Sequence, residues 1–341
     1  MLYLDPVKFS SDPESKISMK VLITGSSGSF GTVIVKSLIE KGIPVVGLDI
    51  RENSCNKSGN SFTFYKCSIT DKDCLRSIFL KEMPDRIIHF ACTFNRVRNR
   101  QKEFDIDVTG SRNILEISNE TPSVKQLVFS SSALAYGGNR DNPLWISEMH
   151  PLRPGKLRYG LNKKIIEKIY SETPVREDLN LNIIRVCTVV GPDFAKPASV
   201  VYILLKWSWL PEFYKKNKVQ FLHTEDFISL IHLIINDDQI KGIYNIATDT
   251  YSVVDELFPD KKYFKLPLFI VTGFLSVIYN LRIMNLQPSG INSSIYPIIL
   301  DPAKIVTRYN YRFKFTSSEA FAKAEINESI DLRENLRQDH N

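Results

Sequence analysis

A glycine-rich loop between an apolar strand and an amphipathic helix constrains the fold of this chain most. The apolar run Val21–Thr24 is followed by Gly25, Gly28 and Gly31, which gives the spacing G-x-x-G-x-x-G. Gly25 permits a tight turn, Gly28 lets the backbone approach a pyrophosphate, and Gly31 lets the helix pack closely against the strand. The amino end of the helix offers N–H groups to phosphates. Because the loop stands between a strand and a helix, it predicts a dinucleotide site.

An acidic residue follows this loop at the distance that ribose binding requires. Asp49 ends the apolar run Val45–Asp49 and comes eighteen residues after Gly31, close to the expected separation of ~20 residues. A carboxylate at that point accepts hydrogen bonds from both ribose hydroxyls and repels a 2′-phosphate, which favours NAD over NADP. Arg51 leaves NADP as an alternative cofactor, because a nearby arginine can bind that phosphate. In the alternative interpretation Asp49 is an ordinary turn residue at the end of a strand.

Strand-like and helix-like segments alternate through the first half of the chain. Buried strands are predicted at Lys20–Thr24, Val45–Asp49, Arg86–Phe90, Gln126–Ser130 and Leu181–Val186, and helices at Gly31–Lys41, Asp71–Leu80, Gly110–Ser118 and near Tyr159–Tyr170. This alternation predicts an α/β fold with a Rossmann-type, doubly wound parallel sheet and a smaller, mixed C-terminal substrate-binding region. The expected parts are an N-terminal extension at 1–18, a cofactor-binding domain at 19–186, a mainly substrate-binding region at 187–330 with segments that return to the sheet, and a polar tail at 331–341.

Composition and charge argue against several classes of protein. Of the 341 residues, 43% are hydrophobic and 24% charged, which is ordinary for a globular protein. The net charge of +6 is spread along the chain without a basic stripe, which argues against nucleic-acid binding and suits an anionic, phosphorylated substrate. The cysteines show neither zinc-ligand spacing nor a paired framework, and no apolar signal segment begins the chain, so we expect no metal and a cytoplasmic location. The five cysteines are Cys55, Cys67, Cys74, Cys92 and Cys187.

One long apolar segment, Leu266–Leu281, stands out in the C-terminal third. It is uncharged for sixteen residues and is flanked by basic residues, Lys261, Lys262 and Lys265 before it and Arg282 after it. A membrane span needs about 20 apolar residues, and both Pro267 and Gly273 interrupt this segment. The sequence therefore predicts a buried helix or a lid over the substrate pocket in preference to a membrane contact.

A tyrosine and a lysine at helical spacing are the strongest candidates for chemistry. Tyr159 and Lys163 form a Y-x-x-x-K pair, which places both side chains on one face of a helix. The ammonium of Lys163 is expected to lower the pKa of the Tyr159 phenol, so that Tyr159 can act as general base for an alcohol and general acid for a ketone. Ser132 follows the apolar run Leu127–Phe129, where its hydroxyl can bond the reacting oxygen. As a bare motif the pair is common by chance and often structural, and the serines are ordinary turn residues in the alternative interpretation.

The combined motifs resemble the extended short-chain dehydrogenases/reductases, and within them the NAD-dependent epimerase/dehydratase family. The subgroup most similar is that of the bacterial UDP-glucose 4-epimerases, and the resemblance runs from about Lys20 to Phe321. Besides the glycine loop and Asp49, it rests on His89-Phe90-Ala91 with the short stretch from Phe90 to Asp107, Ser131-Ser132-Ala133, Tyr136–Pro143, Tyr159 with Lys163, Gly191-Pro192, His223–Asp226, Tyr244–Ile246 and Tyr296-Pro297 with Asp301.

The resemblance implies a role for each matching residue. Tyr159 would be the catalytic base, Lys163 would hold the nicotinamide ribose, and Ser132 would orient the substrate hydroxyl, while Asp226 and Asn245 would be structural. Along the cofactor it places Gly25, Ser27, Gly28, Ser29, Phe30, Gly31, Asp49, Arg51, Ser68, Ile69, Phe90, Ala91, Cys92, Ser130 and Val186. Along the substrate it places Ser132, Ala133, Thr188, Lys216, Lys218 and Val219. Relatives pair through two helices per subunit, so a homodimer is expected.

Departures from the family pattern narrow the reaction. Relatives that dehydrate sugars carry Asp-Glu where this chain has Ala133-Leu134, which disfavours a dehydratase. Relatives that bind sugar nucleotides carry asparagine at Thr188 and often arginine at Val219; Lys216 or Lys218 is expected to compensate. Ser68 and Asp107 replace a frequent aspartate and asparagine, respectively.

These comparisons leave three interpretations of function. The leading one is an NAD-dependent sugar-nucleotide epimerase, which oxidises a carbinol and reduces it again. The first alternative is an NAD(P)-dependent dehydrogenase or reductase of a bulky apolar alcohol or ketone, which the apolar segment and Val219 favour. The second is a non-catalytic NAD-binding protein. The intact set of Ser132, Tyr159 and Lys163 argues against this last interpretation, because a silent site has no chemical need for all three.

Overall fold

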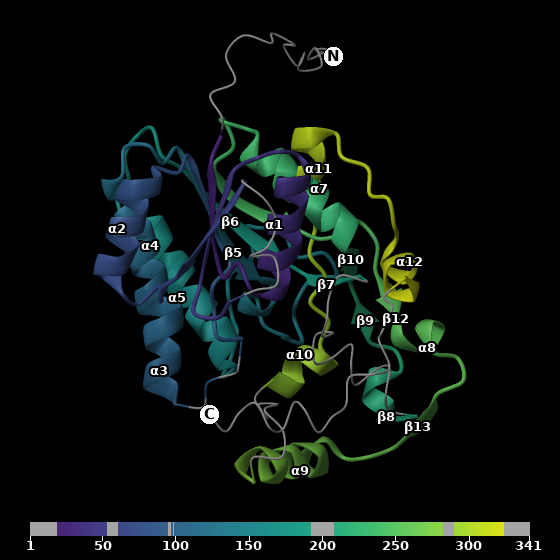
Figure 1. Cartoon of the computed structure of the whole chain (residues 1–341). Coiled ribbons are helices and arrows are strands. Elements are labelled where there is room, and N and C mark those ends of the chain that lie inside the picture. Colours follow the sequence, from purple (N-terminus) through teal and green to yellow (C-terminus); the bar gives the residue numbers. More distant parts are fainter. Residues whose placement is uncertain are drawn as a thin grey trace.

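A seven-stranded parallel sheet forms the centre of the molecule in this computed structural model (Figure 1). The structure describes residues 19–52, 61–94, 97, 99–191, 208–281 and 290–323. The strand order is β11-β6-β5-β4-β1-β2-β3, and every neighbouring pair is parallel. The order reverses between β1 and β4, where open α/β sheets bind ligands at the carboxyl ends of their strands. The strands are β1 (Val21–Thr24), β2 (Val45–Asp49), β3 (Phe62–Lys66), β4 (Arg86–His89), β5 (Gln126–Ser132), β6 (Asn180–Val186) and β11 (Gly242–Ile246).

Helices cover both faces of this sheet. Figure 1 shows α1 and α7 on one face and α2, α4 and α5 on the other. The alternation of side chains along β1 serves both layers, because Val21 and Ile23 pack in one core cluster with Ile34, whereas Leu22 packs in the other with Phe79. The helices are α1 (Ser29–Glu40), α2 (Lys72–Glu82), α3 (Arg100–Phe104), α4 (Gly110–Glu120), α5 (Arg158–Glu172), α7 (Thr224–Ile235), α8 (Val254–Leu257), α9 (Leu268–Asn280), α10 (Ile291–Ile295), α11 (Ala303–Tyr309) and α12 (Ser317–Ala322).

The predicted α/β fold is confirmed, with some boundaries moved. The strand predicted at Gln126–Ser130 continues to Ser132, and the strand predicted at Arg86–Phe90 ends at His89. The edge strand β3 was not predicted, because it is only half-buried and lacks a continuous apolar run. A π-helical turn, η2 (Asp105–Thr109), joins α3 to α4, so the helix predicted from Gly110 begins ten residues earlier, at Arg100.

In the described part of the C-terminal half, three small two-stranded sheets lie beside the helices α7 to α12. They pair β10 with β7, β12 with β9 and β13 with β8. A third core cluster, which includes Phe221 and Phe321, packs among them. The strands are β7 (Thr188–Val190), β8 (Trp209–Pro211), β9 (Lys218–Val219), β10 (Phe221–His223), β12 (Ser252–Val253) and β13 (Lys262–Phe264). From this half of the chain β11 returns to the central sheet. The N-terminal extension, the polar tail, Pro192, Cys55 and Arg282 lie outside the described residues.

Two predictions from the sequence are wrong in the structure. The segment Leu266–Leu281 forms the helix α9, but none of the helix residues is buried, so the predicted buried helix is wrong, whereas the alternative of a lid stays a prediction. Its apolar composition alone could not show whether a partner surface exists. The structure also joins Cys67 and Cys74 in a disulfide, with Cα atoms 6.5 Å apart, although the cysteine spacing indicated no pairing. The chain turns sharply between β3 and α2, and this turn brings the two cysteines together. Within the described residues, no helix is long and apolar enough to cross a membrane.

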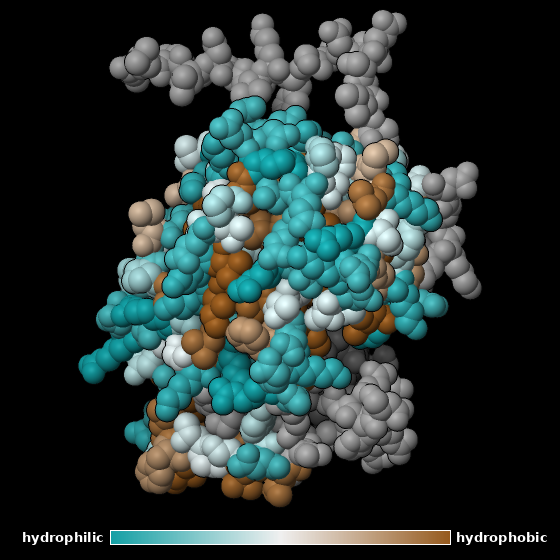
Figure 2. All heavy atoms as spheres, turned by 90° about the vertical axis from the view of Figure 1, so that its left-hand side faces the viewer, coloured by the Kyte–Doolittle hydropathy of each residue, from teal (hydrophilic) through white to brown (hydrophobic). Residues whose placement is uncertain are grey.

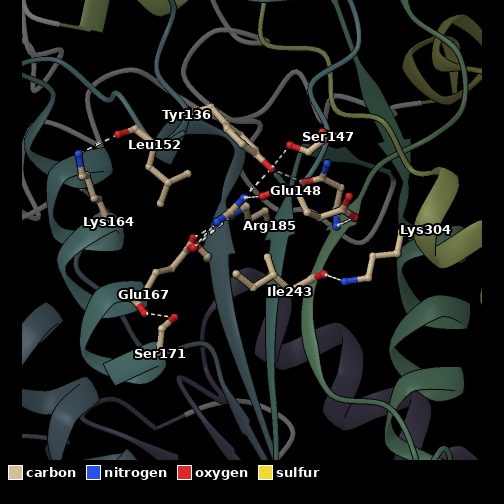
Figure 3. A network of polar contacts seen from close by, with 12 residues as sticks. Tyr136, Ser147, Glu148, Leu152, Lys164, Glu167, Ser171, Arg185, Ile243 and Lys304 are labelled. Carbon is tan, nitrogen blue, oxygen red and sulfur yellow. Dashed lines mark hydrogen bonds and ion pairs between the residues drawn. The ribbon is translucent and has the colours of Figure 1, made fainter. Parts of the chain in front are cut away.

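A buried ion pair connects β6 to α5 (Figure 3). The guanidinium of Arg185 donates from Nε and Nη2 to the carboxylate of Glu167, at 3.1 and 2.6 Å. Its Nη1 donates to the Tyr136 hydroxyl at 2.7 Å, and that hydroxyl lies 2.9 Å from Oδ1 of Asn245. The hydroxyl of Ser131 donates to the same Glu167 carboxylate. Burial raises the pKa of Tyr136 to about 12, so its phenol stays protonated within this network.

Removal of one partner from this pair should cost far more stability than removal of a surface partner on the same helix. Glu167→Ala leaves the Arg185 guanidinium buried without its counter-ion, which costs about 3–5 kcal/mol. Glu172→Ala is the matched control, because its pair with Lys168 is mostly exposed and contributes about 0.5 kcal/mol or less. Urea unfolding followed by circular dichroism measures both changes. Equal losses in the two variants would contradict the role given to Arg185 and Glu167.

Candidate active site

The glycine loop between β1 and α1 leaves no room for side chains at two of its positions. Gly25 has φ +71°, and a Cβ there would lie 2.7 Å from the backbone nitrogen of Ala91. A Cβ on Gly31 would collide with the carbonyl oxygen of Gly25. Gly28 is the N-cap of α1, and no side chain caps this helix. The loop is thus a cradle of backbone at a helix amino end, which fits the diphosphate of a dinucleotide.

Asp49 closes this cradle at the end of β2. Its carboxylate accepts hydrogen bonds from the backbone N–H of Ser27 at 3.1 Å and of Arg51 at 3.0 Å. The Ser27 hydroxyl donates to the carbonyl oxygen of Arg51 at 2.7 Å, so the loop and the strand end are held together. The Arg51 side chain is on the surface. Asp49 is itself 8% exposed, and it sits where a ribose beside the diphosphate would meet a carboxylate.

The other predicted cofactor residues lie around the same edge of the sheet. Phe30 and Phe90 pack ring against ring with centroids 5.7 Å apart, so their side chains belong to the core and only their backbone lines the loop. Ser68 bonds to the Thr70 hydroxyl at 2.7 Å in the turn after β3. Ile69 is buried against Gly110 at the start of α4. Ser68 and Ile69 thus lie on the side of the predicted cofactor site that is next to β2 and β3.

The structure brings Tyr159, Ser132 and Lys163 together. Ser132 is the last residue of β5, and the other two lie on the first turns of α5. The Tyr159 phenol is hydrogen-bonded to the Ser132 side chain and is also in contact with the Cys92 side chain. Lys163 Nζ donates to the carbonyl oxygen of Ser130 at 2.6 Å and lies 5.5 Å from the centre of the Tyr159 ring. A hydroxyl, a phenol and an ammonium therefore converge at one strand end.

The expected effect of Lys163 on the Tyr159 pKa is not what the structure shows. Burial raises the pKa of Tyr159 well above its ordinary value, and the nearby groups of Cys92 and Asp107 raise it further. The hydrogen bond with Ser132 lowers the pKa of Tyr159, but by less than burial raises it. The Lys163 ammonium is directed at a backbone carbonyl rather than at the phenol oxygen. At neutral pH the phenol is thus protonated, ready to donate to an oxygen, and needs further positive charge to act as a base.

Asp107 is a buried carboxylate behind the tyrosine. It lies on η2 and accepts hydrogen bonds from the backbone N–H of Thr93 at 2.8 Å and from the side-chain amide of Asn162 at 3.1 Å. Asn162 lies between Tyr159 and Lys163 on α5. The carboxylate thus fixes the segment after β4 against the catalytic helix. The Tyr159 ring also packs edge-on against Phe94, with centroids 5.0 Å apart, a contact that no sequence pattern indicated.

His89 ties three elements together beneath the site. One ring nitrogen lies 2.6 Å from the hydroxyl of Thr24 on β1, and the other lies 2.8 Å from the hydroxyl of Ser111 on α4. Burial lowers the pKa of His89 to about 3, and the Lys163 charge contributes in the same direction. The imidazole is therefore neutral at physiological pH and holds the strand ends in register.

The rim of the site is reached from three helices. Arg158, which directly precedes Tyr159, pairs with the buried carboxylate of Glu103 on α3 at 3.1 Å. Its guanidinium also lies 3.4 Å from the hydroxyl of Tyr279 on α9. Burial raises the pKa of Glu103, and the Arg158 charge opposes this. Sequence reasoning missed these contacts because the partners are far apart in the chain.

The predicted substrate residues fall into two groups. Thr188 comes two residues after Val186, whose register partner across β5 and β6 is Ser132, so Thr188 and Ala133 both lie just past the carboxyl ends of these strands. Lys216 is instead 80% exposed and pairs with Asp255 at 2.6 Å.

Lys218 and Val219 belong with this second group. The Lys218 ammonium lies 5.4 Å from the centre of the Tyr251 ring, and Val219 packs against the third core cluster. The lysines are therefore engaged with the C-terminal half, and their contact with a substrate stays a prediction. In the described residues no group of three or more histidine, cysteine or acidic side chains is placed to hold a metal ion.

Comparisons with known proteins identify the family of the chain. The model of the NAD dependent epimerase/dehydratase family matches residues 21–247. A UDP-glucose 4-epimerase of Erwinia amylovora is 33% identical over 162 residues, which cover 44% of this chain and 47% of that protein. The chain thus aligns with about half the length of such curated relatives.

Solved structures share the fold over nearly the whole chain. The Bordetella bronchiseptica enzyme WbmG in complex with NAD has a TM-score of 0.70 at 19% identity, covering 92% of this chain and 94% of that one. A UDP-glucose 4-epimerase of Thermotoga maritima with UDP-glucose has a TM-score of 0.69 at 22% identity, covering 90% of this chain and 97% of that one. The family match spans both the glycine loop and the catalytic helix, which confirms the resemblance seen in the sequence. The chain belongs to the NAD dependent epimerase/dehydratase family.

Proposed function

We propose that this protein is an NAD-dependent epimerase of a nucleotide sugar. The observation that carries the proposal is the convergence of Tyr159, Ser132 and Lys163 at the carboxyl end of β5, beside a backbone cradle for a dinucleotide. Curated relatives of the chain include UDP-glucose 4-epimerases. The basic net charge of +6 also suits a substrate that carries phosphates.

Some residues of the chain would bind NAD, and others would transfer the proton of the substrate hydroxyl. The loop from Gly25 to Gly31 would hold the diphosphate of NAD, Asp49 its adenine ribose, and Lys163 its nicotinamide ribose. Bound NAD would supply an acceptor for hydride and, in its oxidised form, a positive charge. That charge would offset the burial that keeps Tyr159 protonated. Tyr159 would then take the proton of the substrate hydroxyl, which Ser132 orients, and return it after the ketone has turned.

Epimerisation fits the site better than dehydration. Dehydration needs a further acid and base next to the sugar, and the residues after Ser132 are Ala133 and Leu134, which begin the short helix η3 (Ala133–Ala135). Neither side chain can exchange a proton. The groups that remain near Tyr159 suffice to remove a proton and give it back, which is what epimerisation requires.

A dehydrogenase or reductase of an apolar alcohol is the second candidate. The observation in its favour is the apolar helix α9, whose Tyr279 reaches Arg158 beside the catalytic tyrosine. A net redox enzyme would release a reduced cofactor with each product, whereas an epimerase would not. The amount of reduced cofactor released per product therefore distinguishes the two candidate functions.

We also propose that the protein pairs as a homodimer through the helices on the side of α2 to α5. Figure 2 shows a strip of apolar side chains on this side of the molecule. Phe104 of α3 and Ile165 of α5 are among the large apolar residues exposed there. A contact between copies would cover such a strip, because exposed apolar patches commonly mark interfaces.

Loss of the Tyr159 hydroxyl should abolish turnover without loss of the fold. Tyr159→Phe removes the group that exchanges the proton, so turnover of the sugar nucleotide should fall ~10²–10⁴-fold while NAD binding is retained. Tyr170→Phe is the matched control on the same helix. Its hydroxyl is buried and donates to the Ser111 carbonyl at 2.9 Å, so that variant should lose about 1 kcal/mol of stability and keep its activity. Near-full activity in Tyr159→Phe would show that the tyrosine is structural.

The position of Asp49 predicts the choice of cofactor. Calorimetry should find NAD bound at least tenfold more tightly than NADP, a difference of about 1.4 kcal/mol, because a carboxylate repels the 2′-phosphate. Asp49→Asn should narrow this ratio. Glu40→Gln removes a charge from the exposed far end of α1 and should leave the ratio unchanged. Equal or tighter binding of NADP to the unaltered protein would overturn the assignment and give the decisive role to Arg51.

A further inference from the structure

The outward face of α9 is apolar along its whole length. Ile270, Phe274, Val277 and Leu281 follow one another at helical spacing, and each of them is more than 40% exposed. Phe269 beside this stripe is 74% exposed. Figure 1 places α9 at the lower end of the molecule, and Figure 2 shows apolar side chains gathered at that end. A helix that is apolar on every face normally lies in a core or against lipid, and none of the residues of α9 is buried.

Between Asp260 and Asp301, the stretch of sequence that contains this helix carries only positive charge. From 261 to 300 the sequence contains no aspartate or glutamate, and its charged residues are Lys261, Lys262, Lys265 and Arg282. Lys262 and Lys265 are exposed, and the Lys262 ammonium lies 5.1 Å from the centre of the Trp209 ring on the neighbouring strand β8. Trp209 is itself 54% exposed. The strand β13 leads along the chain into α9, so exposed lysines and a tryptophan precede an exposed apolar helix, a combination typical of segments that lie at the surface of an anionic bilayer.

From these observations we infer that α9 and the basic residues beside it dock the protein on the surface of an anionic phospholipid bilayer. The 13 residues of the helix extend about 20 Å, whereas the hydrocarbon core is about 30 Å thick, so α9 lies in the plane of the interface and does not cross it. From sequence alone, a buried helix or a lid was favoured over a membrane contact. The exposure of Phe269 and Phe274 reverses that preference.

A second copy of the chain fits this face less well. In a symmetric dimer the same patch faces itself, so Lys262 and Lys265 of both copies would lie at one interface, to which the segment 261–300 contributes no carboxylate. Like charges placed together at an interface oppose association. The phosphates of an anionic bilayer instead complement these lysines while its acyl chains accept the apolar stripe.

Docking through α9 would turn the catalytic edge of the sheet toward the bilayer. The Tyr279 hydroxyl of α9 lies 3.4 Å from the guanidinium of Arg158, the residue before Tyr159. The docking surface and the rim of the site are thus in direct contact. The protein would therefore bind its substrate close to the membrane surface. This consequence rests on the proposed function, whereas the docking itself does not.

Sedimentation of the full-length protein with vesicles tests the docking. Vesicles made of phosphatidylglycerol and phosphatidylcholine in equal parts should bind the protein, vesicles of phosphatidylcholine alone should bind it at least fivefold more weakly, and high salt should release it. Phe269→Glu/Phe274→Glu should lower binding to the mixed vesicles at least tenfold. Leu144→Glu/Met149→Glu is the matched control, because these residues are 41% and 92% exposed outside both α9 and the helices α2 to α5, and it should bind like the unaltered protein.

A charge variant keeps the test decisive if the phenylalanine variant fails to fold. Lys262→Glu/Lys265→Glu alters only exposed side chains and should also weaken binding to the mixed vesicles at least tenfold. The proposal is overturned if the unaltered protein sediments no more with vesicles than without them, or if the α9 variants and the control lose binding equally. It is also overturned if light scattering shows that the α9 variants convert a dimer to a monomer while vesicles bind none of the proteins. No sugar or turnover is involved, so a failure of the epimerase proposal leaves this outcome unaffected.

Discussion

The geometry of Tyr159, Lys163 and Ser132 depends on the buried ion pair between Arg185 and Glu167. Arg185 lies on β6, next to β5, and Glu167 lies on α5, four residues after Lys163. With Ser131 bonded to the same carboxylate, the pair fixes the rotation of α5 relative to the end of β5. Tyr159 and Lys163 share the helix face that this contact directs toward the sheet. A phenol on α5 and a hydroxyl on β5 can therefore meet without a covalent or metal link.

The reversal of strand order between β1 and β4 explains why the glycine loop and the amino end of α5 lie at the same edge of the sheet. All strands run parallel, so their carboxyl ends share one edge, and His89 joins Thr24 on β1 to Ser111 on α4 below it. The glycine loop leaves this edge on one side of the reversal and Ser132 leaves it on the other. The carboxylate of Asp107 then holds the segment between them against α5. Chemistry at this edge follows from topology as much as from the identity of any one residue.

Local patterns in the sequence predicted the parallel sheet, the glycine cradle and the pairing of Tyr159 with Lys163, because each rests on spacing within one or two elements. Properties that depend on distant partners were not accessible in this way. The raised pKa of Tyr159 comes from burial by the assembled fold, and the pairing of Cys67 with Cys74 comes from the turn between β3 and α2. The exposure of α9 was missed for the same reason, since apolar composition does not reveal whether a neighbouring surface exists.

The fate of the hydrogen on the reacting carbon tests the central claim most directly. The protein with bound NAD would be incubated with UDP-glucose that carries deuterium at carbon 4, and the product would be examined by proton NMR. An epimerase would give the epimeric sugar nucleotide with deuterium still on carbon 4 and no reduced cofactor in solution, because the same hydride leaves and returns. Deuterium in free NADH, with an oxidised sugar nucleotide as product, would contradict the account. Complete absence of turnover with NAD bound would contradict it for this nucleotide sugar as well.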